Sequence, residues 1–194
     1  MESTIDLPCP LCGEGGYKML AMSTDLAYFG EHTQITLICE SCGWKHTDFI
    51  PSEGEKPGAW SLSLDSEEKM AARVVRSSSC TIRITGLDLE VTPGSASSGF
   101  ISNVEGVIKR FEDAIGVLIR GSSEDSGSSS LGEANELLAR LEEVKGGGTD
   151  SRILLLDPRG RSQILHEDAE SRDLTQEEEA VLEEGGGPVD LGVG

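Results

Sequence analysis

Aromatic side chains, positive charge and long apolar runs are all scarce in this chain of 194 residues. Aromatic residues make up 4% of it, so any core must rest on Leu, Ile, Val and Ala. No apolar stretch approaches the roughly 20 residues that a membrane-spanning helix needs. The N-terminus also lacks the basic region and apolar run of a signal peptide. These absences lead us to expect a cytoplasmic protein with no membrane partner.

The balance of charge disfavours several kinds of partner. Asp and Glu number 35 against 16 Lys and Arg, which gives a net charge of −19. Such a surface repels both the phosphate backbone of a nucleic acid and an anionic lipid leaflet. We therefore do not expect a nucleic acid or a membrane as the partner.

Motifs of catalysis are also missing. The three histidines, His32, His46 and His166, form no H-x-H or H-E-x-x-H pattern. No glycine-rich loop has phosphate-binding spacing, and no G-x-S-x-G nucleophile elbow appears. We interpret the histidines as ordinary strand or surface residues and expect that the protein is not an enzyme.

Two C-x-x-C pairs are the strongest signal, formed by Cys9, Cys12, Cys39 and Cys42. Two intervening residues let one tight turn present both sulfurs of a pair to the same ion, and four thiolates suit tetrahedral zinc. A glycine follows each pair, where a positive φ and a missing side chain should let backbone amides approach the sulfurs. The sequence therefore predicts one zinc ion bound by these four cysteines.

Two other uses of the cysteines fit the pattern less well than zinc. A redox C-x-x-C usually stands alone near a βαβ unit, and no such unit is apparent. An iron–sulfur cluster could use the same four cysteines, but the two glycine-backed turns favour zinc. Because four thiolates close the coordination shell, the ion should be structural. The fifth cysteine, Cys80, lies in a strand pattern and should be a buried small hydrophobe.

Composition divides the chain into three parts. Residues 1–50 hold the cysteine pairs and the stretches HTQITLIC and WKHTDFI, which predict a hairpin with the second pair at its turn. Residues 51–166 alternate strand-like and helical patterns. From residue 167 to 194 the chain carries ten acidic residues and one arginine, which predicts a mostly flexible acidic tail. Within that tail, the Thr175-x-x-Glu178 spacing predicts a short helix over 175–184.

The hydrophobic period changes twice in the middle region. Alternating apolar residues predict strands around 60–64, 80–84 and 87–91. A capping box at Ser102 and Glu105 opens a helix, and a linker at 121–130 separates it from a second helix that ends at Gly146. A helical hairpin is therefore predicted at about 102–146. The chain then returns to strand at 152–156 and turns at 157–160.

In this order the motifs resemble the ZPR-type zinc-finger family. Besides CPLCG and CESCG, the likeness is carried by Val74–Ser77 before a strand, Asn103–Ile108 at a helix start, and Asp157–Ser162. It runs from about Cys9 to Leu182. Three positions depart from the family pattern, because Ser102-Asn103 stands where the family has a threonine pair and Arg161 where it has asparagine.

The resemblance implies a mainly β fold, with an N-terminal zinc ribbon followed by a double-stranded β-helix-like domain that carries an inserted helical hairpin. Eukaryotic relatives have two copies of this module, whereas this chain has one, as archaeal members do. The eukaryotic relatives bind the translational GTPase elongation factor one-alpha and assist its folding. For this chain the resemblance implies a zinc-binding protein-interaction module, acting as chaperone or adaptor for such a GTPase.

The alternative function is that of a nucleic-acid-associated zinc ribbon in transcription or translation. Residues 1–50 carry seven acidic residues against Lys18 and Lys45. Four thiolates on Zn²⁺ would add two further negative charges, so phosphate binding is disfavoured.

Four side chains that the fold does not obviously need are candidates for partner recognition. They are Tyr28 and Phe29 in the loop of the ribbon, and Arg159 and Arg161 at the DPRG turn that follows residues 152–156. Aromatic anchors ringed by polar groups often dominate interface energy. Either both rings cover the zinc hairpin, or one of them offers such an anchor to a basic client.

Overall fold

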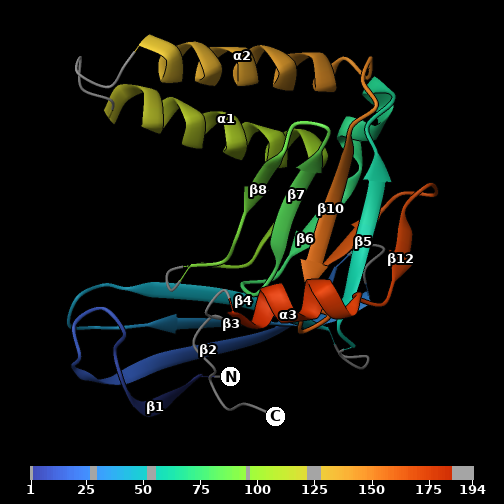
Figure 1. Cartoon of the computed structure of the whole chain (residues 1–194). Coiled ribbons are helices and arrows are strands. Elements are labelled where there is room, and N and C mark those ends of the chain that lie inside the picture. Colours follow the sequence, from blue (N-terminus) through green and yellow to red (C-terminus); the bar gives the residue numbers. More distant parts are fainter. Residues whose placement is uncertain (1, 27–29, 52–55, 95–96, 122–127, 185–194) are drawn as a thin grey trace.

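The computed structural model describes residues 2–26, 30–51, 56–94, 97–121 and 128–184 (Figure 1). Its helices are α1 Val104–Gly121, α2 Ser128–Lys145, α3 Gln176–Glu184 and the 3-10 helix η1 Glu67–Ala71. None of the helices in these ranges is long and apolar enough to cross a membrane. The strands are β1 Glu2–Pro8, β2 Gly15–Leu26, β3 Gly30–Ile38, β4 Lys45–Pro51, β5 Gly58–Ser63, β6 Arg73–Arg76, β7 Thr81–Thr85, β8 Leu89–Val91, β9 Phe100–Asn103, β10 Arg152–Asp157, β11 Gln163–Leu165 and β12 Glu170–Arg172.

The first four strands form one antiparallel sheet in the order β1-β2-β3-β4. The β-branched residues of β3 favour a strand, and β3 pairs with β4 from Ile38 opposite Lys45 to His32 opposite Pro51. The hairpin predicted at the second cysteine pair is therefore confirmed. β1 and β2 form a matching hairpin at the first pair, where Pro8 lies opposite Gly15. We refer to this sheet with its two turns as the ribbon.

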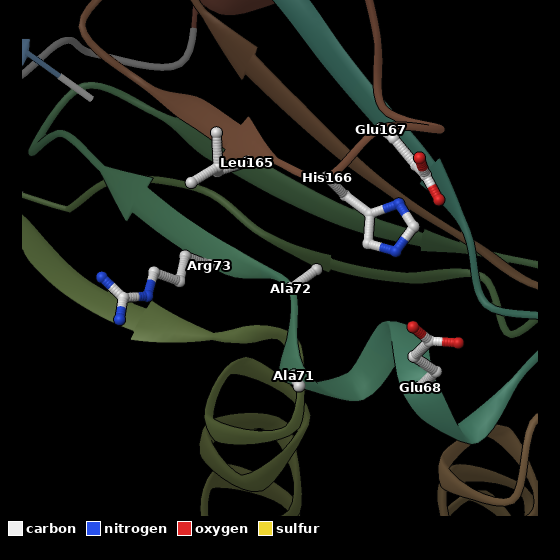
Figure 2. Close-up of a pocket in the computed structure, with 7 residues that line it drawn as sticks. All are labelled: Glu68, Ala71, Ala72, Arg73, Leu165, His166 and Glu167. Carbon is white, nitrogen blue, oxygen red and sulfur yellow. The ribbon is translucent and has the colours of Figure 1, made fainter. Parts of the chain in front are cut away.

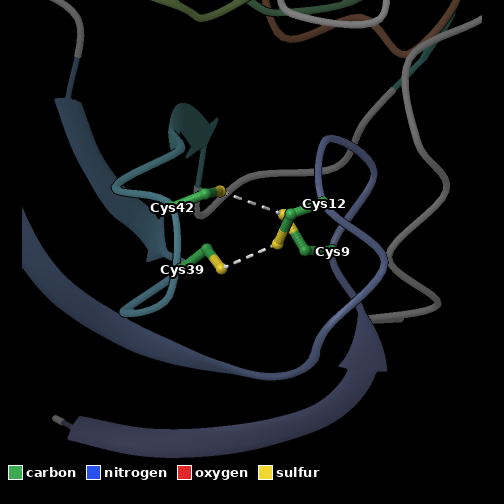
Figure 3. Close-up of side chains that lie close together, drawn as sticks. All are labelled: Cys9, Cys12, Cys39 and Cys42. Carbon is green, nitrogen blue, oxygen red and sulfur yellow. Dashed lines mark hydrogen bonds between the residues drawn. The ribbon is translucent and has the colours of Figure 1, made fainter.

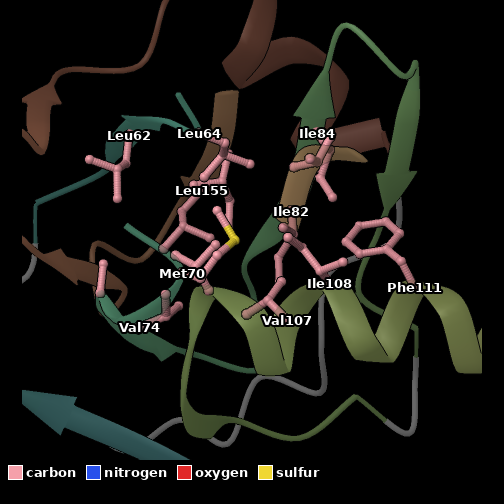
Figure 4. Packing of buried hydrophobic residues seen from close by; sticks show 14 of the residues in the cluster. Leu62, Leu64, Met70, Val74, Ile82, Ile84, Val107, Ile108, Phe111 and Leu155 are labelled. Atoms are coloured by element: carbon pink, nitrogen blue, oxygen red, sulfur yellow. The ribbon is translucent and has the colours of Figure 1, made fainter. Parts of the chain in front are cut away.

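Two further sheets pack against each other to form the larger β domain. Their strand orders are β12-β5-β10-β7-β8 and β11-β6-β9. Strands distant in sequence lie side by side, since β10 is paired on one edge with β5 and on the other with β7. Inward side chains of both sheets and of α1 form the main core (Figure 4). Leu62, Ile84 and Leu155 are among its fully buried members, and each such burial stabilises the fold by about 1.5–3 kcal/mol.

α1 and α2 form the predicted helical hairpin, which projects from one end of the larger β domain (Figure 1). α2 begins at Ser128, inside the predicted linker 121–130, so that boundary is wrong. The predicted capping box at Ser102 is also wrong, by one residue. β9 pairs with β6 as far as Asn103, which holds Ser102 in the strand, and Asn103 Oδ1 instead accepts the N–H of Gly106 at 2.8 Å.

The C-terminal part differs from the flexible tail that the sequence predicts. β12 pairs with the outer edge of β5, with Ser171 opposite Trp60, and Leu174 is buried against Ala59 and Leu156. The predicted short helix is confirmed as α3, and its capping box is reciprocal. Thr175 Oγ1 accepts the N–H of Glu178 at 3.2 Å, and the Glu178 carboxylate accepts the N–H of Thr175 at 2.9 Å. Residues 185–194 lie outside the described residues.

Candidate metal centre

The two cysteine pairs lie in turns of nearly identical backbone geometry. In the first turn, Cys9 N–H donates to Glu14 O at 2.7 Å and Gly13 N–H donates to Cys9 O at 2.8 Å. In the second turn, Cys39 N–H donates to the carbonyl of Trp44 at 2.8 Å and the following glycine N–H donates to Cys39 O at 2.9 Å. The glycines after the pairs have φ of 74° and 75°, a region that L side chains rarely adopt. The predicted positive φ is therefore confirmed, whereas a Cβ at either glycine would meet no atom within 4 Å, so the missing side chain is not needed for space.

The turns bring the four sulfurs together between the ends of the two hairpins (Figure 3). Cys9 Sγ lies 3.7 Å from Cys42 Sγ, and Cys12 Sγ lies 3.7 Å from Cys39 Sγ. All four sulfurs lie within 4.8 Å of one another. These contacts are too long for disulfides, whose S–S bond is about 2.05 Å. A regular tetrahedron with Zn–S bonds of about 2.3 Å has S···S edges of about 3.8 Å, so the donor set fits one zinc ion.

The closeness of the four sulfurs favours a cation at their centre. Backbone N–H groups of the second turn, that of Cys42 first, lower the pKa of Cys39 to about 7. The pKa of Cys12 is raised to about 12, because desolvation and the neighbouring thiols outweigh the backbone hydrogen bond at Glu14. Thiolates this close repel one another, so they do not all ionise without a compensating charge. A divalent ion supplies that charge and releases the protons.

Aromatic residues pack beside the buried half of the site. Cys9 and Cys39 are buried, whereas Cys12 and Cys42 are exposed. Tyr17 is 2% exposed, and its hydroxyl donates to Pro8 O at 2.5 Å. Its ring lies 5.6 Å from that of Trp44. This packing was not predicted, although Trp44, two residues after Cys42, was a usable signal.

The histidines and the fifth cysteine lie outside the sulfur cluster. His46 stacks on Trp44 with ring centroids 5.8 Å apart, and burial lowers its pKa. His32 is buried in β3. Cys80 is fully buried beside β7, and burial raises its pKa to about 12. Cys80 therefore behaves as the buried small hydrophobe that was predicted.

Besides the sulfur cluster, the larger β domain has a cavity between η1 and the end of β11 (Figure 2). It is a cavity of ≈ 500 Å³ whose lining includes Glu68, His166 and Glu167. These residue types can bind metals. Within the described residues, however, only the four cysteines bring three or more such ligand atoms within 4.8 Å. The cavity therefore offers no comparable metal site.

The candidate recognition residues have different outcomes. Tyr28 and Phe29 lie outside the described residues, so their role stays a prediction. The expectation that the fold does not need Arg161 is wrong. Its backbone N–H donates to Asp157 Oδ2 at 2.9 Å, and its guanidinium lies 3.5 Å from the Asp48 carboxylate. These two buried carboxylates, which organise the turn and join it to the ribbon, carry no recognisable signal in the sequence.

Comparison with known proteins agrees with this architecture. The sequence model of the ZPR1 jelly-roll domain matches residues 68–183. An uncharacterized ZPR1-like protein of Methanocaldococcus jannaschii is 37% identical over 186 residues, which cover 95% of this chain and 92% of that protein. Zinc finger protein ZPR1 of Bos taurus is 29% identical over 178 residues, or 87% of this chain and 37% of the bovine protein. The zinc finger chaperone zpr1 of Schizosaccharomyces pombe is 22% identical over 170 residues, or 83% and 35%.

The matched segment contains most of the larger β domain, the helical hairpin and most of α3. The expected fold is confirmed, because a cluster of four cysteines precedes a jelly-roll domain that carries a helical hairpin. The match covers more than half of the chain, and the archaeal relative aligns over nearly all of it. The chain belongs to the ZPR1 family.

Proposed function

We propose that this chain is a zinc-stabilised protein-binding module that acts as a chaperone or adaptor. The observation that carries the proposal is the closed set of four sulfurs. Four thiolates complete a tetrahedral shell and leave no open position for a substrate or a reactive water. We assign Cys9, Cys12, Cys39 and Cys42 as the ligands of one structural Zn²⁺, and we infer that the chain is not an enzyme.

The chaperone role is supported by the family. The fission yeast relative is named a zinc finger chaperone, and the ZPR-type resemblance implies a client of the elongation factor one-alpha class. The net charge of −19 suits a client with a basic surface, because complementary potentials speed encounter. Exposed apolar side chains at the first turn, Leu7 at 40% and Leu11 at 69%, offer contact area beside the metal site.

A folding assay tests the proposal directly. A chemically unfolded elongation factor one-alpha-type GTPase is diluted into buffer with or without this protein, and the recovery of nucleotide binding is followed. We expect the zinc-loaded chain to raise the recovery, and Cys39→Ser to lose that effect because the ribbon no longer folds. Cys80→Ala is the matched control, since Cys80 lies outside the sulfur cluster. Equal recovery with and without the chain would rule out the chaperone role for this client.

A further inference from the structure

The ribbon contacts the larger β domain, which is the jelly-roll domain of the family, through a buried carboxylate on β4. Asp48 is 5% exposed. Its Oδ1 accepts the backbone N–H of Ser78 at 2.9 Å, and its Oδ2 accepts the Ser78 hydroxyl at 2.7 Å. Beside it, the N–H of Gly99 donates to Thr47 O at 2.7 Å. The carboxylate of one domain is therefore solvated mainly by groups of the other domain.

The groups that receive Asp48 are themselves fixed by a second buried carboxylate. The hydroxyls of Ser77 and Ser79, on either side of Ser78, donate to Asp157 at 2.7 and 2.6 Å. Asp157 also accepts the backbone N–H of Arg161, whose guanidinium approaches Asp48 at 3.5 Å. These contacts form a closed circuit, and we call residues 77–79 the serine loop. Such a connected circuit restricts Ser78 to one position for Asp48.

The same strand joins Asp48 to the sulfur cluster. β4 begins at Lys45, directly after the second cysteine turn. Alternate residues of a strand share a face, so His46 and Asp48 point the same way, and both are buried. The His46 ring stacks on Trp44, whose carbonyl accepts the N–H of Cys39. The short segment from Cys39 to Asp48 therefore connects the metal ligands to the contact with the serine loop.

We propose that metal binding by the ribbon and docking of the ribbon on the serine loop are thermodynamically coupled through Asp48. Without a metal ion the sulfur contacts of 3.7 Å between the two turns are weak, so metal loss loosens the second turn and the start of β4. Asp48 then leaves Ser78. Linkage requires the reverse effect to be equal in size: weakening the Asp48–Ser78 contact weakens zinc binding. The coupling is a property of the fold and does not rest on the proposed chaperone role.

The test is a substitution in the jelly-roll domain that touches no metal ligand. Ser78→Ala removes the 2.7 Å hydroxyl bond to Asp48 and leaves the ribbon sequence intact. We expect its dissociation constant for Zn²⁺, measured by competition with a chromophoric chelator, to rise roughly tenfold, equal to about 1.4 kcal/mol. Ser171→Ala, at an exposed position of β12, is the matched control and should bind zinc like the unmodified chain. A Ser78→Ala curve that superimposes on that of the unmodified chain would overturn the proposal.

Hydrogen exchange of the unmodified protein gives an independent readout that does not depend on any variant. The Ser78 amide is bonded to Asp48 Oδ1, so its exchange rate reports docking. Removal of zinc with a chelator should raise that rate at least tenfold, while the amide of Ile153, in the centre of the larger sheet, should change little. Unchanged protection of Ser78 after zinc removal would show that the two events are independent.

Discussion

Removing the Asp157 carboxylate should destabilise the jelly-roll domain more than almost any other single polar change. Asp157 is 1% exposed. It accepts hydroxyl bonds from Ser77, Ser79 and Ser162 at 2.6–2.7 Å, and two backbone N–H groups of its own turn at 2.9–3.0 Å. Each bond to a charged acceptor is worth about 1.5–3 kcal/mol, but burial of the carboxylate costs several kcal/mol. We therefore expect Asp157→Ala to lower the free energy of unfolding by about 3–5 kcal/mol.

Urea unfolding followed by circular dichroism, with zinc in excess, measures this loss. Asp157→Asn should fall between the unmodified chain and Asp157→Ala. The serine hydroxyls can rotate to accept a hydrogen bond from the NH₂ group of the new Asn side chain. A backbone N–H can only donate, so an N–H that faces this NH₂ group loses its acceptor. Asp150→Ala, at an exposed position before β10, is the control and should stay within about 0.5 kcal/mol of the unmodified chain. A loss below about 1 kcal/mol for Asp157→Ala would refute the view that this carboxylate organises the turn and the serine loop.

Two further predictions concern helix ends. Asn103→Ala should lower the free energy of unfolding by about 1 kcal/mol because it removes the cap of α1. Ser102→Ala should change it by less than about 0.5 kcal/mol. If thermal unfolding shows the larger loss for Ser102→Ala, then Ser102 is the cap, as the sequence predicts. Glu178 should titrate far below the usual range, since its hydrogen bonds with Arg172 bring its pKa to about 2. A lowered folded-state pKa stabilises α3 above about pH 4.5, and this contribution is lost as the pH falls toward 2. An NMR titration of the Glu178 carboxylate with a midpoint near 4.5 would contradict this.

Local chemistry made part of the fold predictable. Cysteine spacing with a following glycine identified both turns, because a positive φ is needed there whatever the rest of the chain does. Helical periodicity placed α1 and α2 within a few residues. The Thr175-x-x-Glu178 spacing gave the start of α3, since a capping box is complete within four residues.

Elements that depend on distant partners were not predictable in the same way. β12 has only exposed residues and forms because β5 offers an unpaired edge to it. β6 and β9 have four residues each, which is too short to show a clear alternation of apolar residues. They pair directly with each other, although β7 and β8 lie between them in the sequence. The buried carboxylates Asp48 and Asp157 look like surface residues in sequence, and only the tertiary fold supplies their serine partners.

Metal analysis of the reduced protein, purified without added zinc, tests the central claim most directly. The four sulfurs, with two contacts of 3.7 Å among them, match the edges of a tetrahedral zinc–thiolate site. The account predicts about one equivalent of zinc per chain, and its loss in Cys39→Ser but not in Cys80→Ala. Recovery of iron, or of fully reduced protein that contains no metal and takes up no zinc, would contradict it.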